Sequence, residues 1–380
     1  MTLLTHRLTP FHGVEGETLC QVHKSLLPIM SSLSDAQRRA LALLPKVSGL
    51  VSALCSALIV YSVLHSPQKR SRAYHRLLLG IAIADISNSF WFGLSTWPIP
   101  DNDGASVMYT AGTPTSCEIQ GFFIQWGNAS GLYNASLALY YLLVLRYGWN
   151  EAKLQQYNVE PYLHGFPLIW ATSTACLGIP LRLYNNANLW CWIAPYPAGC
   201  NVGDDYSNCL RGQNADMFRW MFYYGPLWCS ILFVTVSMTL VFFRVTKKMS
   251  ADYDYEGANK KNETTPNSPA HSQAEGTAAA ATTSSTTSSS SSAAVTRRQV
   301  ALQCFLYASS FYLNWMWMTA VRILQAAQKP VPYGLLVTAA AMTPLFGLPN
   351  VCVYLFPSYL AARQEYPQGN VWAWIQMALS

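Results

Sequence analysis

The stretch that decides the fold is residues 220–243, WMFYYGPLWCSILFVTVSMTLVFF, which lies between Arg219 and Arg244 and contains no charged residue. An α-helix rises about 1.5 Å per residue and the hydrocarbon core of a bilayer is about 30 Å thick, so roughly 20 apolar residues cross it. Inside lipid, every backbone N–H and C=O group must be paired within the segment, which favours a helix over a strand. The stretch therefore predicts a transmembrane helix.

Six other segments are also long enough to cross the hydrocarbon core, and a single charge, Asp85, interrupts only the second of the seven in chain order. We therefore predict an all-α protein, a seven-transmembrane helix bundle with five helices in residues 43–245 and two in residues 299–358. The residues that bound the seven segments are Lys46 and Lys69, Arg76 and Asp101, Glu118 and Arg146, Glu160 and Arg182, Arg219 and Arg244, Arg298 and Arg322, and Lys329 and Arg363.

The composition agrees with lipid as the surrounding medium. Charged residues make up 11% of the 380 residues, under half of the roughly 25% usual in soluble domains. A soluble enzyme and a nucleic-acid-binding protein are therefore not expected. Mean hydropathy is only +0.16, because the polar segment 246–298 dilutes an apolar remainder. We expect that segment to be a disordered loop, since it cannot bury enough apolar surface to offset the entropy of ordering. Its Ala/Thr/Ser tract is either a spacer or a cluster of phosphoacceptors.

Lys and Arg gather in alternate loops, which sets the expected orientation. The loop after the first segment is the clearest case, with Lys69, Arg70, Arg72 and Arg76. The positive-inside rule places such loops in the cytosol. We expect a multi-pass plasma-membrane protein with the amino-terminal tail, residues 1–42, outside and the tail 359–380 in the cytosol. Residues 371–379 of that tail are apolar enough to lie in the inner membrane interface.

Cysteines on the predicted outer side suggest two disulfide bonds. Cys117 stands at the outer start of the third helix and Cys191 in the loop after the fourth, so a bond between them would tie this loop across the bundle. Cys200 and Cys209 are close enough in sequence to close a smaller loop, which would leave Cys20 unpaired. Sequence alone does not prove connectivity, so both pairs are hypotheses.

With these features the chain resembles a G-protein-coupled receptor. Residues 189–193, Leu-Trp-Cys-Trp-Ile, are similar to the Cys-Trp signature in the second extracellular loop of cyclic-AMP-receptor-like and secretin-like receptors. Residues 79–85, Leu-Gly-Ile-Ala-Ile-Ala-Asp, are similar to the Leu-Ala-x-Ala-Asp segment of rhodopsin-like receptors, and Trp170 falls where these carry a tryptophan in helix four. The resemblance covers the whole bundle, residues 46–359.

The resemblance implies a receptor without enzymatic activity, cofactor or metal. Its expected partners are an extracellular small-molecule or peptide ligand, a heterotrimeric G protein, the bilayer, and kinases and arrestin-like proteins at the Ser/Thr loop. Three motifs depart from the rhodopsin-like class and favour a cyclic-AMP-receptor-like relative. Leu145-Arg146-Tyr147 replaces Asp-Arg-Tyr, Pro349-Asn350 precedes Tyr354 in place of Asn-Pro-x-x-Tyr, and helix six lacks its proline.

Four polar residues form the expected activation network: Asp85, Asn88, Asn350 and Tyr354. A charge deep in a membrane helix costs at least about 2.5 kcal/mol, so Asp85 should face the bundle interior with polar partners. Asn88 follows on the same helix face, and Asn350 is the expected partner from the seventh helix. This hub is either a switch, with sodium or a proton, or a structural set of hydrogen bonds.

A second set of residues is expected at the cytosolic ends of the helices, where a G protein would bind. Arg146 lacks the acidic neighbour that restrains it in relatives, which predicts basal activity. The basic residues could equally contact anionic lipid headgroups. The set is Arg146, Tyr147, Lys247, Lys248, Arg297 and Arg298.

Ligand-binding candidates lie in the outer halves of the helices and in the cysteine-tied loop. Binding pockets are mainly apolar with a few polar groups that set orientation. Arg322 either pairs with an anionic ligand or extends to the membrane interface. The candidates are Gln125, Trp126, Trp190, Trp192, Tyr224, Asn314, Trp317 and Arg322.

Two other functions of seven-helix proteins are alternatives to a receptor. A transporter or channel is the main alternative, but such proteins usually show repeated halves and several intramembrane charges, and this chain shows neither. A retinal protein needs a Schiff-base lysine in the last helix, and no lysine lies between Lys329 and Arg363.

Overall fold

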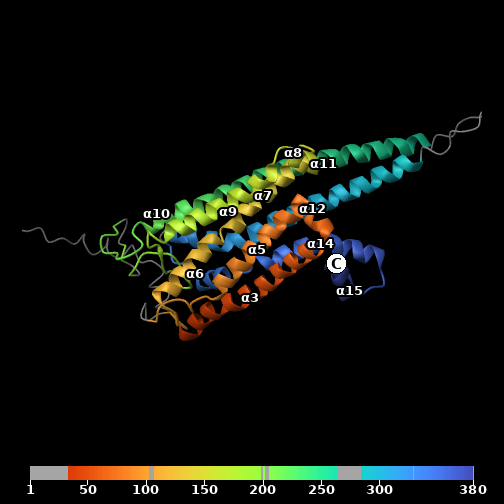
Figure 1. The fold of residues 1–380 in the computed structure, drawn as a ribbon. Coiled ribbons are helices and arrows are strands. Elements are labelled where there is room, and N and C mark those ends of the chain that lie inside the picture. The colour runs from red at the N-terminus through yellow and green to blue at the C-terminus, as the bar shows by residue number, and fades with distance from the viewer. Residues whose placement is uncertain are drawn as a thin grey trace, which may run out of the picture.

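The computed structural model describes residues 33–101, 107–197, 200–201, 205–263, 284–327 and 329–379. In these residues, seven helical rods run side by side along one axis, one for each charge-free segment (Figure 1). The rods are α3 (Asp35–His65), α5 (Ala73–Gly93), α6 (Pro114–Trp126) with α7 (Ala129–Tyr141) and the π-helical turn η1 (Leu142–Arg146), α9 (Val159–Gly178), α10 (Ala215–Arg219) with the π-helical turn η2 (Trp220–Tyr224) and α11 (Gly225–Glu263), α12 (Ser284–Ala326), and α13 (Tyr333–Met342) with α14 (Gly347–Glu365).

Taken singly, fewer rods have the length and hydropathy of a membrane span. Two helices in the described residues meet both requirements, Asp35–His65 and Ala215–Lys248. The pair α13 and α14 adds a third if it counts as one span, although the two helices are bent by 56°. The all-α bundle is therefore observed, while the crossing of a membrane by all seven rods stays a prediction.

The bend between α13 and α14 shows how polar side chains repair a broken helix. Pro344 lies in the break and has no N–H to donate, and its carbonyl accepts a hydrogen bond from Ser89 Oγ at 2.9 Å. The N–H of Gly347 donates to Ser52 Oγ at 2.7 Å. A Cβ atom on Gly347 would stand 2.2 Å from the Ser52 carbonyl oxygen, so only glycine allows this approach. The seventh rod is thus held against α3 and α5.

Four rod ends differ from the boundaries that the sequence predicts, and one of them is the end of α14, which continues to Glu365 past the predicted end at residue 358. α3 begins at Asp35, within the predicted tail, because Ser34 and Gln37 form a reciprocal capping box. α11 continues to Glu263 and α12 begins at Ser284, so both enter the segment predicted as a disordered loop. Backbone bonds within a helix satisfy polar groups without any buried surface, which explains how the rods extend past the bundle (Figure 1). Residues 264–283 lie outside the described part.

A β-hairpin covers one end of the bundle, here called the disulfide end. β1 (Tyr184–Asn186) pairs antiparallel with β2 (Cys191–Ile193), and Tyr184 stands opposite Ile193. All six strand residues are buried. The hairpin is therefore packed into the helices rather than exposed above them.

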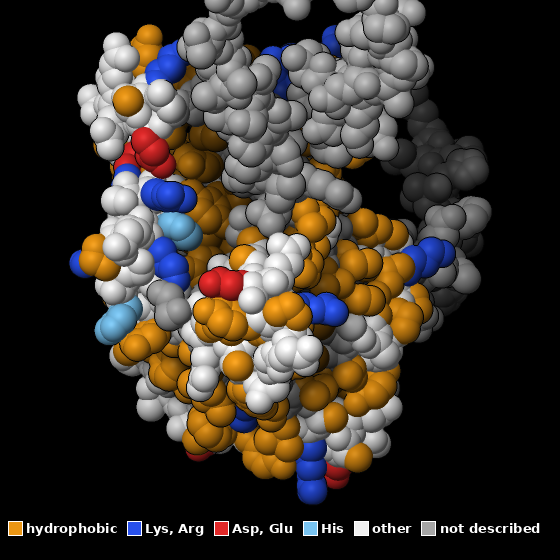
Figure 2. All heavy atoms as spheres, turned by 90° about the vertical axis from the view of Figure 1, so that its right-hand side faces the viewer, with side chains coloured by type: hydrophobic (Ala, Val, Ile, Leu, Met, Phe, Trp, Pro, Cys, Tyr) orange, Lys and Arg blue, Asp and Glu red, His pale blue; other side chains and the backbone are white. Residues whose placement is uncertain are grey.

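Short helices and basic side chains mark the opposite end. The helices there are α4 (Pro67–Arg70), α8 (Glu151–Gln156) and α15 (Val371–Leu379). α15 folds back onto α14, where the Trp374 ring meets Tyr359 with centroids 5.8 Å apart. Figure 2 looks onto this end and shows Lys and Arg side chains scattered among apolar ones. This pattern suits a surface beside lipid headgroups.

Candidate functional site

Two disulfide bonds fix the loop at the disulfide end, with the pairing that the sequence suggests. Cys117 of α6 bonds Cys191 of β2, with an S–S distance of 2.01 Å. Cys200 bonds Cys209 in the connection between β2 and α10. The first bond joins residues 74 apart in the sequence and the second residues 9 apart. The larger ring therefore attaches the hairpin to the third rod, and Cys20 lies outside the described residues.

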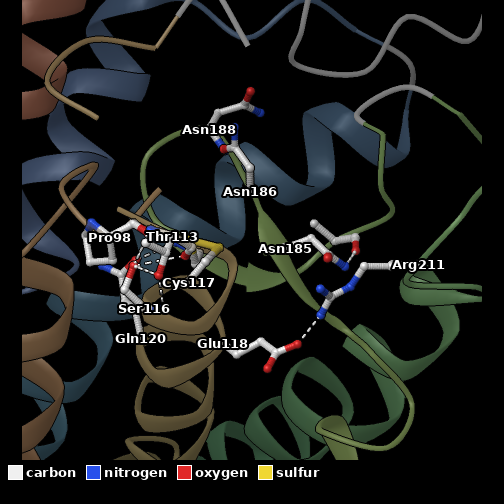
Figure 3. The surroundings of a disulfide bond; sticks show 12 residues. Pro98, Thr113, Ser116, Cys117, Glu118, Gln120, Asn185, Asn186, Asn188 and Arg211 are labelled. Carbon is white, nitrogen blue, oxygen red and sulfur yellow. Dashed lines mark hydrogen bonds and ion pairs between the residues drawn. A yellow bond between two sulfur atoms is a disulfide. The ribbon is translucent and has the colours of Figure 1, made fainter. Parts of the chain in front are cut away.

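Gln120 secures the attachment, a role that the sequence analysis missed. Its side-chain oxygen accepts from the Cys191 N–H at 2.8 Å, and its amide nitrogen donates to the carbonyls of Trp91 and Ser95 at 2.9 Å each. Gln120 lies beside the disulfide in Figure 3 and is fully buried. The only sequence signal for this role is a glutamine within a charge-free helix, and it does not indicate which groups the side chain bonds.

Charged pairs strengthen the same loop. Arg211 pairs with Glu118, the neighbour of Cys117, as Figure 3 shows. Tyr206 donates to the Asp216 carboxylate at 2.6 Å, and Arg219 pairs with that carboxylate at 2.7 Å. Burial, followed by the bond to Asp216, raises the pKa of Tyr206 to about 12, so its hydroxyl stays protonated. The loop is thus tied at several points to α6 and α10.

A backbone carbonyl in η2 gathers side chains from two other rods. Pro226 has no N–H for the carbonyl of Phe222, which lies four residues earlier. Three buried or half-buried donors approach that oxygen instead, each at 3.3 Å. They are Gln125 Nε2, Asn128 Nδ2 and Trp170 Nε1. The π-helical turn thereby joins the third, fourth and fifth rods, and such turns recur at functional sites.

Gln125 connects this carbonyl to the hairpin. Its side-chain oxygen accepts from Trp192 Nε1 at 3.1 Å, and its amide also donates to Thr174 of α9 at 3.1 Å. The Trp192 ring meets Tyr224 edge-on, with centroids 5.8 Å apart. Arg322 Nε donates to the Tyr224 hydroxyl at 2.6 Å. Four predicted ligand residues therefore form one chain of contacts from β2 to α12.

Beside this chain lies a cavity of about 480 Å³, counting the part that opens to solvent, here called the hairpin cavity. Its walls are the hairpin turn 187–190, the outer end of α12 and the facing side of α13. Trp190 and Leu336 supply apolar surface, and Arg322 carries the one full charge among the lining residues. A mainly apolar concave site with few polar groups is typical of ligand pockets.

Of the eight predicted ligand residues, only Trp190 and Arg322 line the hairpin cavity, and three others belong neither to the cavity nor to the chain of contacts. Trp126 turns toward α9, where its Nε1 donates to Thr172 Oγ1 at 3.1 Å. Asn314 is buried in α12 and Trp317 is half-buried one turn later. Within the described part of the chain, the Asn314 oxygen and the Trp317 N–H find no hydrogen-bond partner. Helix geometry explains Trp126, because neighbouring residues point about 100° apart, so it cannot face the interior together with Gln125.

At the centre of the bundle, Asp85 is fully buried and accepts hydrogen bonds at both oxygens. Ser130 Oγ donates to one oxygen, and Asn350 Nδ2 donates to the other at 2.8 Å. Asn350 in turn accepts from Ser310 Oγ at 3.0 Å. The predicted partners Asp85 and Asn350 therefore meet, and this hub joins α5, α7, α12 and α14.

The other two residues of the predicted network lie apart from the hub. Asn88 packs against Gly127, and its side-chain amide makes no hydrogen bond with the described residues. The Tyr354 hydroxyl meets Ser62 Oγ at 3.1 Å, which ties α14 to α3. The structure thus corrects the four-residue network to an Asp85–Asn350 pair with two serines, which the sequence does not single out.

At the end opposite the disulfides, Arg146 closes η1 and lies half-buried beside the Tyr147 ring, with its Cζ 5.6 Å from the centroid. No carboxylate of the described residues lies within 4.0 Å of it. Lys247 and Lys248 are exposed on α11, and the backbone of residues 297–298 is helical in α12. The predicted coupling residues thus stand on η1 and on the extensions of α11 and α12.

An ion pair joins two helices at the same end of the bundle as Arg146. Arg76 at the start of α5 grips Glu160 at the start of α9 through two of its nitrogens. His164, one turn along α9, meets the hydroxyl of Tyr133 at 3.1 Å. Arg76 and Glu160 bound charge-free segments in the sequence, where both look like ordinary ends of membrane helices, so their pairing has no sequence signal.

Comparison with known proteins supports the fold. No protein-family model matches the chain, and no curated protein is similar to it in sequence. Among solved structures, the crystal structure of squid rhodopsin matches with a TM-score of 0.60 over 90% of this chain and 84% of that chain, at 14% sequence identity. At this identity the likeness shows the fold alone, which this chain shares with squid rhodopsin. The cyclic-AMP-receptor-like subfamily stays a prediction.

Proposed function

We propose that the chain is a receptor of the plasma membrane that transmits the binding of an extracellular ligand to a heterotrimeric G protein by helix rearrangement. The observation that carries the proposal is the seven-rod fold shared with squid rhodopsin. The hairpin bonded to the third rod at Cys117 agrees with it. The transporter alternative is not favoured, since the solved structure that the fold matches is that of squid rhodopsin.

The contacts suggest how a ligand at one end would affect the other. A ligand in the hairpin cavity would touch Trp190 and Arg322, and so reach Tyr224 and the hydrogen-bonded Phe222 carbonyl. Movement of α12 relative to α14 must strain the bond between Ser310 and Asn350, which holds the Asp85 hub. A ligand that favours the moved arrangement would shift the population toward it.

Arg146 is the residue on which coupling to the G protein is best tested. It has no carboxylate partner among the described residues, so no ion pair has to break before it meets the G protein. We therefore expect guanine-nucleotide exchange without added ligand. The measurement is exchange on a panel of Gα subunits in membranes that hold the wild-type protein, Arg146→Ala or the control Arg72→Ala, an exposed arginine on the same side.

Exchange above that of empty membranes, lost in Arg146→Ala and kept in Arg72→Ala, supports the receptor proposal. An equal loss of exchange in both variants would assign the activity to surface charge in general. Exchange that both variants keep in full would contradict the role of Arg146. Absence of exchange from folded wild-type protein at the cell surface contradicts basal coupling, and a flux assay would then test the transporter alternative.

A further inference from the structure

The hairpin cavity combines apolar walls with one unbalanced cation. Trp190 is buried and its ring meets Phe92 edge-on, with centroids 4.7 Å apart. Leu336, Ala339 and Ala340 on α13 are also buried, so this wall is firmly packed. Arg322 lies in the same lining, half-buried on α12. A guanidinium group in such surroundings needs a partner, because removing charge from water is costly.

Hydrogen bonds hold the Arg322 guanidinium toward the protein and not toward the surrounding medium. Its Nε donates to Tyr224 at 2.6 Å, and its Nη1 donates to Gln325 at 2.7 Å. The Tyr224 ring also lies below the charge, 5.2 Å from Cζ. Its Nη2 makes no hydrogen bond with the residues that the structure describes. The group is therefore positioned, with donors to spare, at the edge of the cavity.

Neighbouring arginines at the disulfide end behave differently. Arg211 pairs with Glu118. Arg219 pairs with Asp216 at 2.7 Å and donates to the Ile193 carbonyl through its two other nitrogens. Each of these cations has a carboxylate, whereas in the described residues no carboxylate lies within 4.0 Å of Arg322. The missing anion at Arg322 is thus specific to the cavity.

We propose that the hairpin cavity binds a monoanionic carboxylate with an apolar body, whose carboxylate is held by Arg322. The proposal deepens the receptor function and rests on it only in calling this molecule the receptor's ligand. Arginine offers parallel N–H groups that match a carboxylate, and such charge-assisted bonds are among the strongest in proteins. The walls from Trp190 to Leu336 would enclose the apolar body.

The charge balance favours a carboxylate over a phosphate. Among the described residues, Arg322 is the one charged residue that lines the cavity, and the donors of Arg219 are taken by Asp216 and Ile193. One cation balances one negative charge. A phosphate monoester carries more than one at neutral pH and would leave part of its charge uncompensated beside apolar walls. Probes that share one apolar body and differ only in the head group can therefore distinguish a carboxylate site from a phosphate site.

The test measures equilibrium binding to the full-length protein in lipid nanodiscs, with empty nanodiscs subtracted. The probes are 4-phenylbutyrate, its neutral counterpart 4-phenylbutanol and 4-phenylbutyl phosphate, which share one apolar body. The variants are Arg322→Gln, Arg322→Lys and the control Arg39→Gln, an exposed arginine near the start of α3. Arg322→Lys keeps the charge but loses the paired donors, so it decides the matter if Arg322→Gln does not fold.

We expect one saturable site per chain that binds the carboxylate at least tenfold more tightly than the alcohol. Arg322→Gln should weaken the carboxylate at least tenfold and the alcohol less than twofold, with Arg322→Lys in between and Arg39→Gln like the wild type. Equal affinity for carboxylate and alcohol, tighter binding of the phosphate, or no saturable binding overturns the proposal. The assay contains no G protein, so its failure leaves the nucleotide-exchange prediction standing.

Discussion

Replacing Gln125 by leucine tests whether the hairpin is joined to the bundle interior through this side chain. Gln125 is fully buried and accepts a hydrogen bond from Trp192 at 3.1 Å. Leucine keeps most of the volume but leaves the Trp192 N–H without an acceptor. The Thr174 hydroxyl still donates to its own helix, and the Phe222 carbonyl keeps two donors. The expected cost is therefore that of one buried unpaired donor, about 1–3 kcal/mol.

A double-mutant cycle separates this bond from the rest of the packing. Trp192→Phe removes the donor and leaves the ring's contacts mostly in place, so Gln125→Leu should cost less in that background, by about 1–3 kcal/mol. The assay is the free energy of unfolding from denaturant titration in detergent. Gln156→Leu, exposed on α8, should combine additively with Trp192→Phe. An equal cost of Gln125→Leu in both backgrounds would refute the link.

Three further pairs of substitutions test other parts of the structure. Cys117→Ser should destabilise by about 2–5 kcal/mol and Cys200→Ser by less, since the first bond closes the longer loop; thermal unfolding with and without reductant measures both. Asp85→Leu leaves two buried donors unpaired, at about 1–3 kcal/mol each, while Asp85→Asn keeps an acceptor. The recovered monodisperse fraction should therefore be lower for Asp85→Leu than for Asp85→Asn. Gly347→Ala should cost about 1–3 kcal/mol by overpacking, and Gly334→Ala, which faces open space, should cost almost nothing by the same unfolding assay.

The rods were predictable because the absence of charge is a strong signal in lipid. Each charge-free segment holds a rod, and the breaks within rods depend on contacts far away in sequence. Pro344 marks the bend in the seventh rod, but Ser52 and Ser89, which repair it, lie in other helices. The π-helical turn before Pro226 is likewise held by donors from the third and fourth rods. The sequence shows each proline but does not show which side chains of other helices hydrogen-bond the backbone groups beside it.

The faces of the helices were harder to predict than their positions. Lipid and protein interior are both apolar, so a membrane helix shows little amphipathic pattern from which to tell its inner side. Gln125 and Trp126 were both expected in the ligand site, and only Gln125 faces inward. Asp85 was assigned correctly to the interior, because a buried acid must find donors. Ser130, one of those donors, is an ordinary small residue of membrane helices and gives no such signal.

The chemistry of the hairpin cavity depends on a comparison that sequence does not allow. In the sequence, Arg211 and Arg219 lie in the predicted loop before the fifth helix, and Arg322 lies at the predicted outer end of the sixth. In the structure the first two pair with Asp216 and Glu118, while Arg322 has no carboxylate in the described residues. Folding therefore brings carboxylate partners to two of the three, and the contrast with Arg322 is what motivates the proposed carboxylate site.

The most direct test of the receptor proposal is the capture of a G protein by the purified chain. Detergent-solubilised protein is mixed with heterotrimers, their nucleotide is removed enzymatically, and complexes are separated by size. The proposal predicts a one-to-one complex that forms without nucleotide, dissolves when a non-hydrolysable GTP analogue is added, and weakens in Arg146→Ala. A folded, monodisperse protein that captures none of the heterotrimers, with 4-phenylbutyrate present or absent, would contradict it.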